Sequence, residues 1–479
     1  MRTDERSRPG GRPGGIETHT IDFIPSTERR GKPWHLFTLW FGANSVIVSV
    51  VTASILVGGG MSFAWSVAAI VIGFALGGFL AAFHSAQGPQ LGIPQMIQSR
   101  AQFGYVGGIV PMIIAEINYL VFFAAAPAIC GLLAHAVWGW NAYLVAVLVT
   151  AITFVVALFG YDLSHRLAKY LSVASVVVFG ILTILVLSHS GIHHPTTRHL
   201  HTGGFQTGLF LTGIAVTFVY AAGYAPYIAD YSRYLPESTS TRATAWWTYA
   251  GIVVSGIWLF VLGAYLTTVT GFGADTLGSV VQVSDSFSKA FTALLVVVVM
   301  GIQVLQGSLS MYAGGNTALS IATSLRRTVA PVEASLRTRL WSLVPFALVC
   351  LAATIAYSKS FTSAFTDALG VVLILLIPWS AINLADFYLV RDGHYDVQAI
   401  FDPNGEYGRV NVAGAISFLL GFVAELPFAN LGFWAGPVAH RLDGGDLSWL
   451  VGIVVSGACY LLMTRTAPVA VDTPEASTR

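Results

Sequence analysis

Apolar stretches long enough to cross a lipid bilayer fill most of this sequence. A helix of about 20 apolar residues spans a hydrocarbon core about 30 Å thick. Transmembrane strands alternate apolar and polar residues, whereas residues 296–299 are four consecutive valines. Of 479 residues, 55% are hydrophobic and 10% charged, against roughly 25% charged in soluble proteins. We therefore expect an all-α integral membrane protein with twelve transmembrane helices, at residues 36–57, 63–83, 108–136, 141–159, 167–188, 208–230, 246–270, 286–312, 340–357, 361–385, 411–434 and 448–464.

The distribution of Lys and Arg predicts the orientation. With a cytoplasmic N-terminus, every basic residue falls in an inner loop or tail except Arg198, Lys289, Lys359 and Arg441. This bias follows the positive-inside rule. We expect a multi-pass protein of the plasma (inner) membrane with both termini in the cytoplasm. Residues 1–33 and 465–479 are expected to be cytoplasmic tails, the first of them disordered, and residues 386–410 a cytoplasmic loop.

Two of the twelve spans are interrupted by residues that disfavour a regular helix. The first contains Gly42, Asn44 and Ser45, and the sixth contains Gly223 and Pro226. Unwound backbone at membrane depth is tolerated only where it lines a cavity or meets a ligand. Because these spans open consecutive blocks of five, the second block enters from the opposite side, which predicts an inverted repeat of residues 34–188 and 208–385. Residues 411–464 add two further helices.

Polar residues inside the spans are few, and none is a deeply placed Lys or Arg. Glu116 and Asn118 lie in the third span, and Gln303, Gln306, Ser308 and Ser310 in the eighth. An anion would require a cation or open N–H groups, so the site favours a neutral or weakly basic solute. Glu116 is open to two interpretations, a protonated structural carboxyl or a coupling group. Tyr119, Phe122, Phe123, Tyr220 and Tyr224 are open to packing or to stacking on a planar ring.

Two motifs carry a family resemblance. Residues 88–100 read GPQLGIPQMIQSR, followed by FGYVG at 103–107, and residues 229–236 read ADYSRYLP. They closely resemble signatures of the nucleobase-cation symporter family, purine-cytosine permease branch. The resemblance covers roughly residues 17–464. We expect the motifs themselves to support conformation and topology rather than to contact the substrate.

The resemblance implies a LeuT-like 5+5 inverted repeat and cation-coupled (H⁺ or Na⁺) uptake of a nucleobase or related neutral heterocycle by alternating access. By position, the resemblance implies that Gly223 and Tyr224, either Asn118 or Glu116, and Gln306 with Ser308 contact the substrate. Together with the polar and aromatic residues described above, the candidate substrate-binding residues are Asn44, Glu116, Asn118, Tyr119, Phe122, Phe123, Tyr220, Gly223, Tyr224, Gln303, Gln306 and Ser308. The implied cation residues are Gly42, in the break of the first helix, with Ser45, Ser308 and Ser310, and Glu116 is the candidate for proton coupling. The sequence departs from this branch at two places. In the eighth span, Gln306-Gly307-Ser308-Leu309 stands where the branch tends to have asparagines. In the third span, Phe122-Phe123 stands where the branch often has an aromatic residue with a wide indole face.

Other functions remain open at this point. An amine or amino-acid transporter would share the fold, and an intramembrane hydrolase using Ser308 or a receptor are remoter alternatives. The hydrolase lacks a histidine in a facing span and an HExxH motif. The loop at 189–201 contains five histidines, which we interpret as solvated rather than as a metal or pH-sensing site. We expect no enzyme activity, resident metal or cofactor, with substrate, coupling cation and lipid as partners and no nucleic acid.

Overall fold

The computed structural model describes residues 21–159, 161–188, 203–270, 276–325, 336–357 and 361–465. The predictions for most of both tails and for the histidine-rich loop therefore lie outside the described residues. Within the described ranges the chain is helical between its loops, and the one extended pairing is a single bridge between Asn430 and Ala435. This agrees with the expected all-α class.

The first half of the chain contains these helices: α1 (Trp34–Asn44), α2 (Ile47–Thr52), α3 (Ser54–Gly58), α4 (Phe63–Leu91), α5 (Gln95–Gln98), α6 (Arg100–Phe103), α7 (Ile109–Trp138), α8 (Ala142–Phe159) and α9 (Tyr161–Ser188). The second half contains α11 (Thr207–Ala222), α12 (Ala225–Ser232), α13 (Thr241–Thr270), α14 (Thr276–Phe287), α15 (Lys289–Ser324), α16 (Leu336–Tyr357), α17 (Phe361–Ala385), α18 (Val397–Phe401), α19 (Val412–Glu425), α20 (Pro437–Arg441) and α21 (Ser448–Arg465). Short turns of tighter or wider helix are η1 (Ser26–Glu28), η2 (Asp386–Val390, a π-helix) and η3 (Leu426–Phe428).

Each predicted span coincides with helix. Nine helices in the described residues are long and apolar enough to cross a membrane, and the bent pair Trp34–Asn44 and Ile47–Gly58 makes a tenth. Two further apolar helices, at Val412–Phe428 and Ser448–Thr464, are shorter. The predicted span 411–434 is too long, because the helix ends at Phe428 and Gly432 follows at φ +79. The protein is a multi-pass membrane protein.

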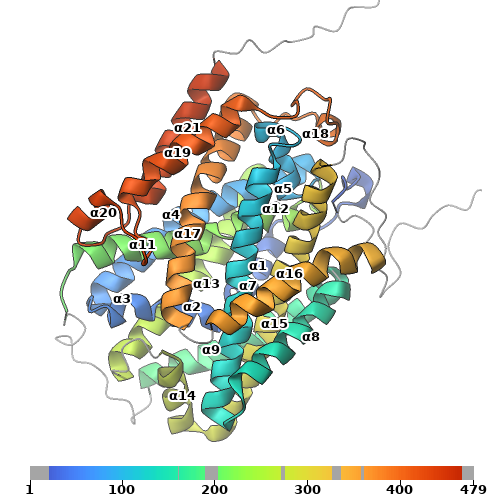
Figure 1. The fold of residues 1–479 in the computed structure, drawn as a ribbon. Helices are drawn as coiled ribbons and strands as arrows, with labels where there is room; N and C mark the ends of the chain where they lie inside the picture. The colour runs from blue at the N-terminus through green and yellow to red at the C-terminus, as the bar shows by residue number, and fades with distance from the viewer. Residues whose placement is uncertain are drawn as a thin grey trace, which may run out of the picture.

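The helices pack in two groups, and each group contains helices from both halves of the chain. α1 and α4 pack against α11, α12 and α13, so the first two spans of each predicted repeat lie together. α7 and α8 pack against α15 and α16, which joins the third and fourth spans of each repeat. This exchange of partners is the arrangement expected of two inverted five-helix units. In Figure 1, α7 runs through the middle of the molecule, and α19 and α21 form a pair on one flank beside α17.

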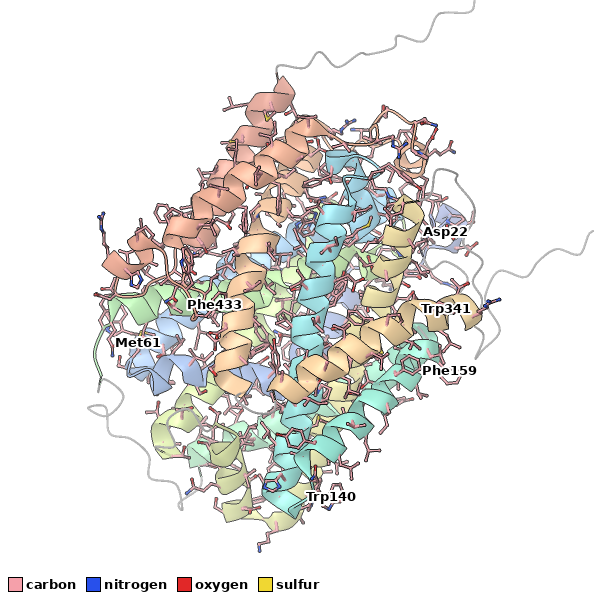
Figure 2. All side chains as sticks on the ribbon, viewed as in Figure 1. Asp22, Met61, Trp140, Phe159, Trp341 and Phe433 are labelled. Atoms are coloured by element: carbon pink, nitrogen blue, oxygen red, sulfur yellow. The ribbon has the colours of Figure 1, made fainter. Side chains whose placement is uncertain are left out.

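Large aromatic side chains stand exposed near the ends of several spans. Trp140, Phe159, Trp341 and Phe433 are all more than half exposed. Figure 2 shows Phe159 and Trp341 at the right-hand edge of the molecule and Trp140 near its lower end. Aromatic side chains at helix ends are typical of the membrane–water interface.

The segment before α1 packs on the loops between spans. The N–H of Ile24 donates to Gly92 O (3.0 Å) and that of Arg30 to Tyr234 O (2.7 Å). Ile24 is 1% exposed. Residues 21–33, which we predicted as part of a disordered tail, are therefore packed on the same face as the loops that follow α4 and α12.

Candidate functional site

The first span breaks between α1 and α2. Ser45 (φ −80, ψ 67) and Val46 (φ −126, ψ 151) leave helical geometry, and the two halves meet at 62°. Our prediction placed Gly42 in the break, and this position is wrong, because Gly42 belongs to the last turn of α1. A Cβ at Gly42 would lie 2.1 Å from Ser172 Oγ on α9. Gly42 thus permits close packing of α1 on α9, and the break comes three residues later.

Polar side chains from three helices converge on this break. The Asn44 amide donates to Ile252 O and to Ser255 Oγ of α13, both at 3.0 Å, and its oxygen accepts the Tyr224 hydroxyl at 2.9 Å. The Ser175 hydroxyl of α9 donates to Ser45 O. Since an unpaired buried carbonyl or amide costs free energy, these bonds stabilise the broken geometry.

The sixth span is interrupted less than predicted. Gly223 (φ −59, ψ −14) and Tyr224 (φ −76, ψ −22) separate α11 from α12 but stay in the right-handed helical region. Thr207–Ser232 still forms one span, so the predicted local unwinding is reduced to a shortened turn. The N–H of Tyr227 bonds Tyr224 O (3.2 Å), three residues back instead of four. Gly223 O instead accepts the Asn118 amide of α7 at 2.9 Å.

A stripe of tyrosines runs through the interruption. Tyr220, Tyr224, Tyr227 and Tyr231 share one helical face by their spacing of four, three and four residues. The Trp40 ring of α1 lies 5.4 Å from that of Tyr224 and 5.4 Å from that of Tyr231. Sequence reasoning missed Trp40 and Tyr227. The spacing of the stripe could have revealed Tyr227, and Trp40 lies one turn before Asn44.

Helix α7 packs two more aromatic side chains onto this stripe. The Phe122 ring lies 5.5 Å from that of Tyr220, and Tyr119 donates to Pro226 O at 3.0 Å. A Cβ at Gly223 would lie 2.8 Å from the Phe122 ring. The structure therefore brings together Asn44, Asn118, Tyr119, Phe122, Tyr220, Gly223 and Tyr224 of the predicted site.

The eighth span supplies amides with open hydrogen-bonding capacity. Gln303 is 1% exposed, and neither atom of its amide has a hydrogen-bond partner among the described residues. Gln306, one turn along the same face of α15, lies near the Tyr227 hydroxyl, and its Oε1 has no hydrogen-bond partner among those residues, nor has Asn118 Oδ1. Buried polar groups normally find partners, so these atoms are candidates for binding a ligand.

The two serines of α15 that we predicted as cation residues, Ser308 and Ser310, have less open hydrogen-bonding capacity than the amides. The Ser308 hydroxyl donates to Leu305 O of its own helix at 2.7 Å, and Ser310 is buried. α15 contacts both α1 and α9. Their predicted role in holding a cation remains a prediction.

Glu116 and Phe123 lie apart from the rest of the predicted site. Glu116 precedes Asn118 by two residues, which is about 200° around a helix. Its electrostatic neighbours are Tyr119 and Cys350, and neither carboxyl oxygen has a hydrogen-bond partner among the described residues. Phe123 packs with Met311 and Cys350. Phe123 therefore faces α15 and α16, whereas Glu116 lies between Cys350 of α16 and Tyr119, which bonds Pro226 O.

A family model, described as permease for cytosine/purines, uracil, thiamine, allantoin, matches residues 23–452. The chain belongs to this permease family. The "Putative purine-cytosine permease YxlA" of Bacillus subtilis (strain 168) is 39% identical over 94% of this chain and 96% of its own. The purine-cytosine permease fcyB of Emericella nidulans is 24% identical over 94% of this chain and 88% of its own.

Solved structures of Mhp1, a nucleobase-cation-symport-1 family transporter, share the fold of this permease. The inward-facing conformation matches with a TM-score of 0.73 over 94% of both chains, and the closed conformation with bromovinylhydantoin bound with 0.72 over 94% and 96%, each at 16% identity. The predicted LeuT-like fold is thereby confirmed.

The permease motif at 88–107 makes contacts that hold the loops and helix ends together, and the absence of substrate contact by the motif remains a prediction. Arg100 is buried and donates to Ser324 Oγ (2.9 Å) and Thr323 Oγ1 (3.2 Å), so it caps the end of α15 and does not reach lipid phosphates. Burial lowers the pKa of this guanidinium to about 10. Asp230 of the second motif accepts the N–H of Gln95 at 2.8 Å. The two motifs therefore contact each other, and the first also contacts the C-terminal end of α15.

Proposed function

We propose that this permease takes up a nucleobase or a related neutral heterocycle of the cytosine, purine or allantoin kind, together with H⁺ or Na⁺, by alternating access. The family description and the names of the relatives support this substrate class. Membership of a family of permeases also argues against the hydrolase alternative. The positive-inside bias supports a plasma-membrane location with both termini in the cytoplasm.

The aromatic side chains suit a flat, uncharged ring. Trp40, Phe122 and the tyrosine stripe line the junction of α1, α7, α11 and α12. Stacking of a base on an aromatic ring contributes about 1–3 kcal/mol. α1, α7, α11, α12 and α15 contain one Lys or Arg, Lys289 at the first residue of α15. A neutral solute therefore matches the charge of the site.

The single observation that carries the proposal is the set of unpaired amide atoms on α7 and α15. Asn118 Oδ1, Gln306 Oε1 and both atoms of Gln303 have no hydrogen-bond partner among the described residues. An amide offers a donor and an acceptor side by side, which complements the hydrogen-bonding edge of a nucleobase. The same atoms without such a ligand would leave desolvated groups unpaired at a cost of about 1–3 kcal/mol each.

The break between α1 and α2 supports a place for the coupling cation. Carbonyl oxygens at such breaks coordinate Na⁺ in transporters with paired interrupted helices, and Gly42, Ser45, Ser308 and Ser310 are our candidates. Glu116 is the candidate if the cation is a proton. Since its side chain faces α16, its coupling would act through helix packing rather than by contact with the substrate.

An amino-acid substrate is disfavoured by the backbone of the break. A carboxylate requires open N–H groups, but the N–H of Ser45 bonds Gly42 O (3.1 Å) and that of Val46 bonds Asn44 O (2.9 Å).

Uptake of radiolabelled cytosine, adenine, hypoxanthine, uracil and allantoin, in cells lacking their own permeases, tests the proposal. We expect accumulation of at least one compound, competition by its unlabelled form, and dependence on a proton or sodium gradient. Absence of uptake of all five by protein shown to be folded and in the membrane would overturn the substrate class. Uptake that ignores both gradients would overturn the coupling.

A further inference from the structure

Phe83, near the inner end of α4, separates two apolar grooves on the surface of the permease. Its ring is 44% exposed and lies 5.5 Å from the ring of Tyr388, whose hydroxyl donates to Phe83 O at 2.8 Å. One groove lies between α4, α17 with η2, and α21, and the other between α4 and α13. Neither belongs to the site described above.

The larger groove has a volume of about 620 Å³, and its lining is almost wholly apolar. Leu80, Leu384 and Leu461 form its walls, and Ala381, Ala385 and Gly457 line it with small side chains. A Cβ at Gly457 would meet no atom within 4 Å among the described residues. The π-helix η2 follows the C-terminal end of α17 and borders the larger groove. Wide helical turns of this kind are frequent at functional sites.

The smaller groove has a volume of about 210 Å³, and the side chain of Arg242 lies at one end of it. Phe79, Trp246 and Tyr249 line it, and the rings of Trp246 and Tyr249 stack at 5.9 Å. Arg242 stands at its end, in the first turn of α13. Arg242 is exposed and has no hydrogen bond or ion pair with a described residue. The Gln90 amide donates to Thr241 Oγ1 at 3.0 Å, which holds this end of α13 against the end of α4.

We propose that the two grooves together bind one anionic diacyl phospholipid of the leaflet on the Arg242 side. One acyl chain lies on each side of Phe83, and the phosphate pairs with Arg242. Trp and Tyr side chains mark the headgroup level, so the exposed Trp246 and the half-buried Tyr249 place the headgroup where Arg242 can reach it. Arg suits phosphate because its planar fork forms two parallel hydrogen bonds.

The charge of the headgroup decides the specificity of this site. An acyl chain leaving bulk lipid for a groove gains no hydrophobic free energy, because both surroundings are apolar. The grooves therefore contribute shape and van der Waals contact. The attraction between Arg242 and an anionic headgroup distinguishes phosphatidylglycerol from zwitterionic phosphatidylcholine.

The experiment measures lipid retained by the purified full-length permease, by native mass spectrometry, after equal exposure to phosphatidylglycerol and phosphatidylcholine. We expect at least a fivefold preference for phosphatidylglycerol, lost in Arg242→Gln and kept in Arg337→Gln, which removes another exposed arginine. Gly457→Phe fills the larger groove and should reduce retention of both lipids. Gly180→Phe, on α9, where a Cβ likewise meets nothing within 4 Å among the described residues, should not.

Three outcomes would overturn the proposal. Equal retention of the two lipids would remove the role of charge. If Arg337→Gln and Arg242→Gln reduced the preference for phosphatidylglycerol equally, the anionic lipid would be attracted by the basic surface as a whole and not by Arg242. Competition by glycerol 3-phosphate, which lacks acyl chains, would show a phosphate site without a role for the grooves. Melting temperatures of all four variants, measured in detergent before lipid is added, show that a loss of retention does not come from unfolding.

Discussion

The hydroxyl of Tyr224 donates a hydrogen bond to the side-chain oxygen of Asn44, 2.9 Å away. Asn44 is the last residue of α1 before the break, and Tyr224 lies in the interruption between α11 and α12. This bond therefore connects the two interruptions directly, and a second bond between Ser49 Oγ and the Tyr220 hydroxyl (2.9 Å) joins the same two spans. The Asn44 amide also donates hydrogen bonds to Ile252 O and Ser255 Oγ, which link the break to α13.

Tyr224→Phe should lower the free energy of unfolding by about 1–2 kcal/mol, because it leaves a buried amide oxygen without its donor. It should also reduce uptake, since the two interruptions lose their direct connection. Thermal unfolding in detergent and tracer uptake measure the two effects. Tyr143→Phe, whose ring is 45% exposed, is the control and should change neither. Unchanged stability of Tyr224→Phe would contradict the importance of this bond.

Gly42→Ala should destabilise the permease by about 1–3 kcal/mol, the usual cost of overpacking. The new Cβ would lie 2.1 Å from Ser172 Oγ and 2.3 Å from Ser172 Cβ. Ser172→Gly removes both atoms, so the double variant should recover part of the loss. Gly180→Ala on α9 meets nothing within 4 Å among the described residues and should be neutral. Failure of Ser172→Gly to rescue would show that Gly42 acts in another way.

Gln303→Leu should separate stability from transport. The variant removes a buried amide without partners in the described structure, so the melting temperature should stay the same or rise. Uptake should fall at least tenfold through a higher KM, if the amide binds the substrate. Gln282→Leu, an exposed position on α14, should leave KM unchanged. A marked fall in stability would instead assign Gln303 to interhelical bonding.

Glu116→Gln should abolish the response of uptake to an imposed pH gradient but spare a response to a sodium gradient. Glutamine keeps the shape of a protonated carboxyl and cannot release a proton. The measurement compares initial uptake rates at equal internal pH and stepped external pH. Glu425→Gln, the other buried carboxyl without a hydrogen-bond partner among the described residues, is the control. A pH response that survives Glu116→Gln would assign proton coupling elsewhere or leave sodium as the cation.

The helices, their membrane setting and the family could all be predicted from the sequence. Lipid requires long apolar helices with internally bonded backbone, so each span is visible in local composition. The spacing of Gln303 and Gln306 likewise predicts a shared face without reference to any other helix. The motifs at 88–107 and 229–236 indicate the family because they are contiguous.

Contacts between distant segments decided the rest. The break lies at Ser45 and Val46 instead of Gly42, because Ser175, Ile252 and Ser255 supply hydrogen bonds there. The interruption at Gly223 is shallow, since one side chain, Asn118, takes the carbonyl that the shortened turn leaves open. Only packing determines that Trp40 enters the tyrosine stripe. Local sequence thus determined which segments become membrane helices, and the tertiary structure decided where they break and which face of each meets the site, because those choices depend on partners more than 100 residues away.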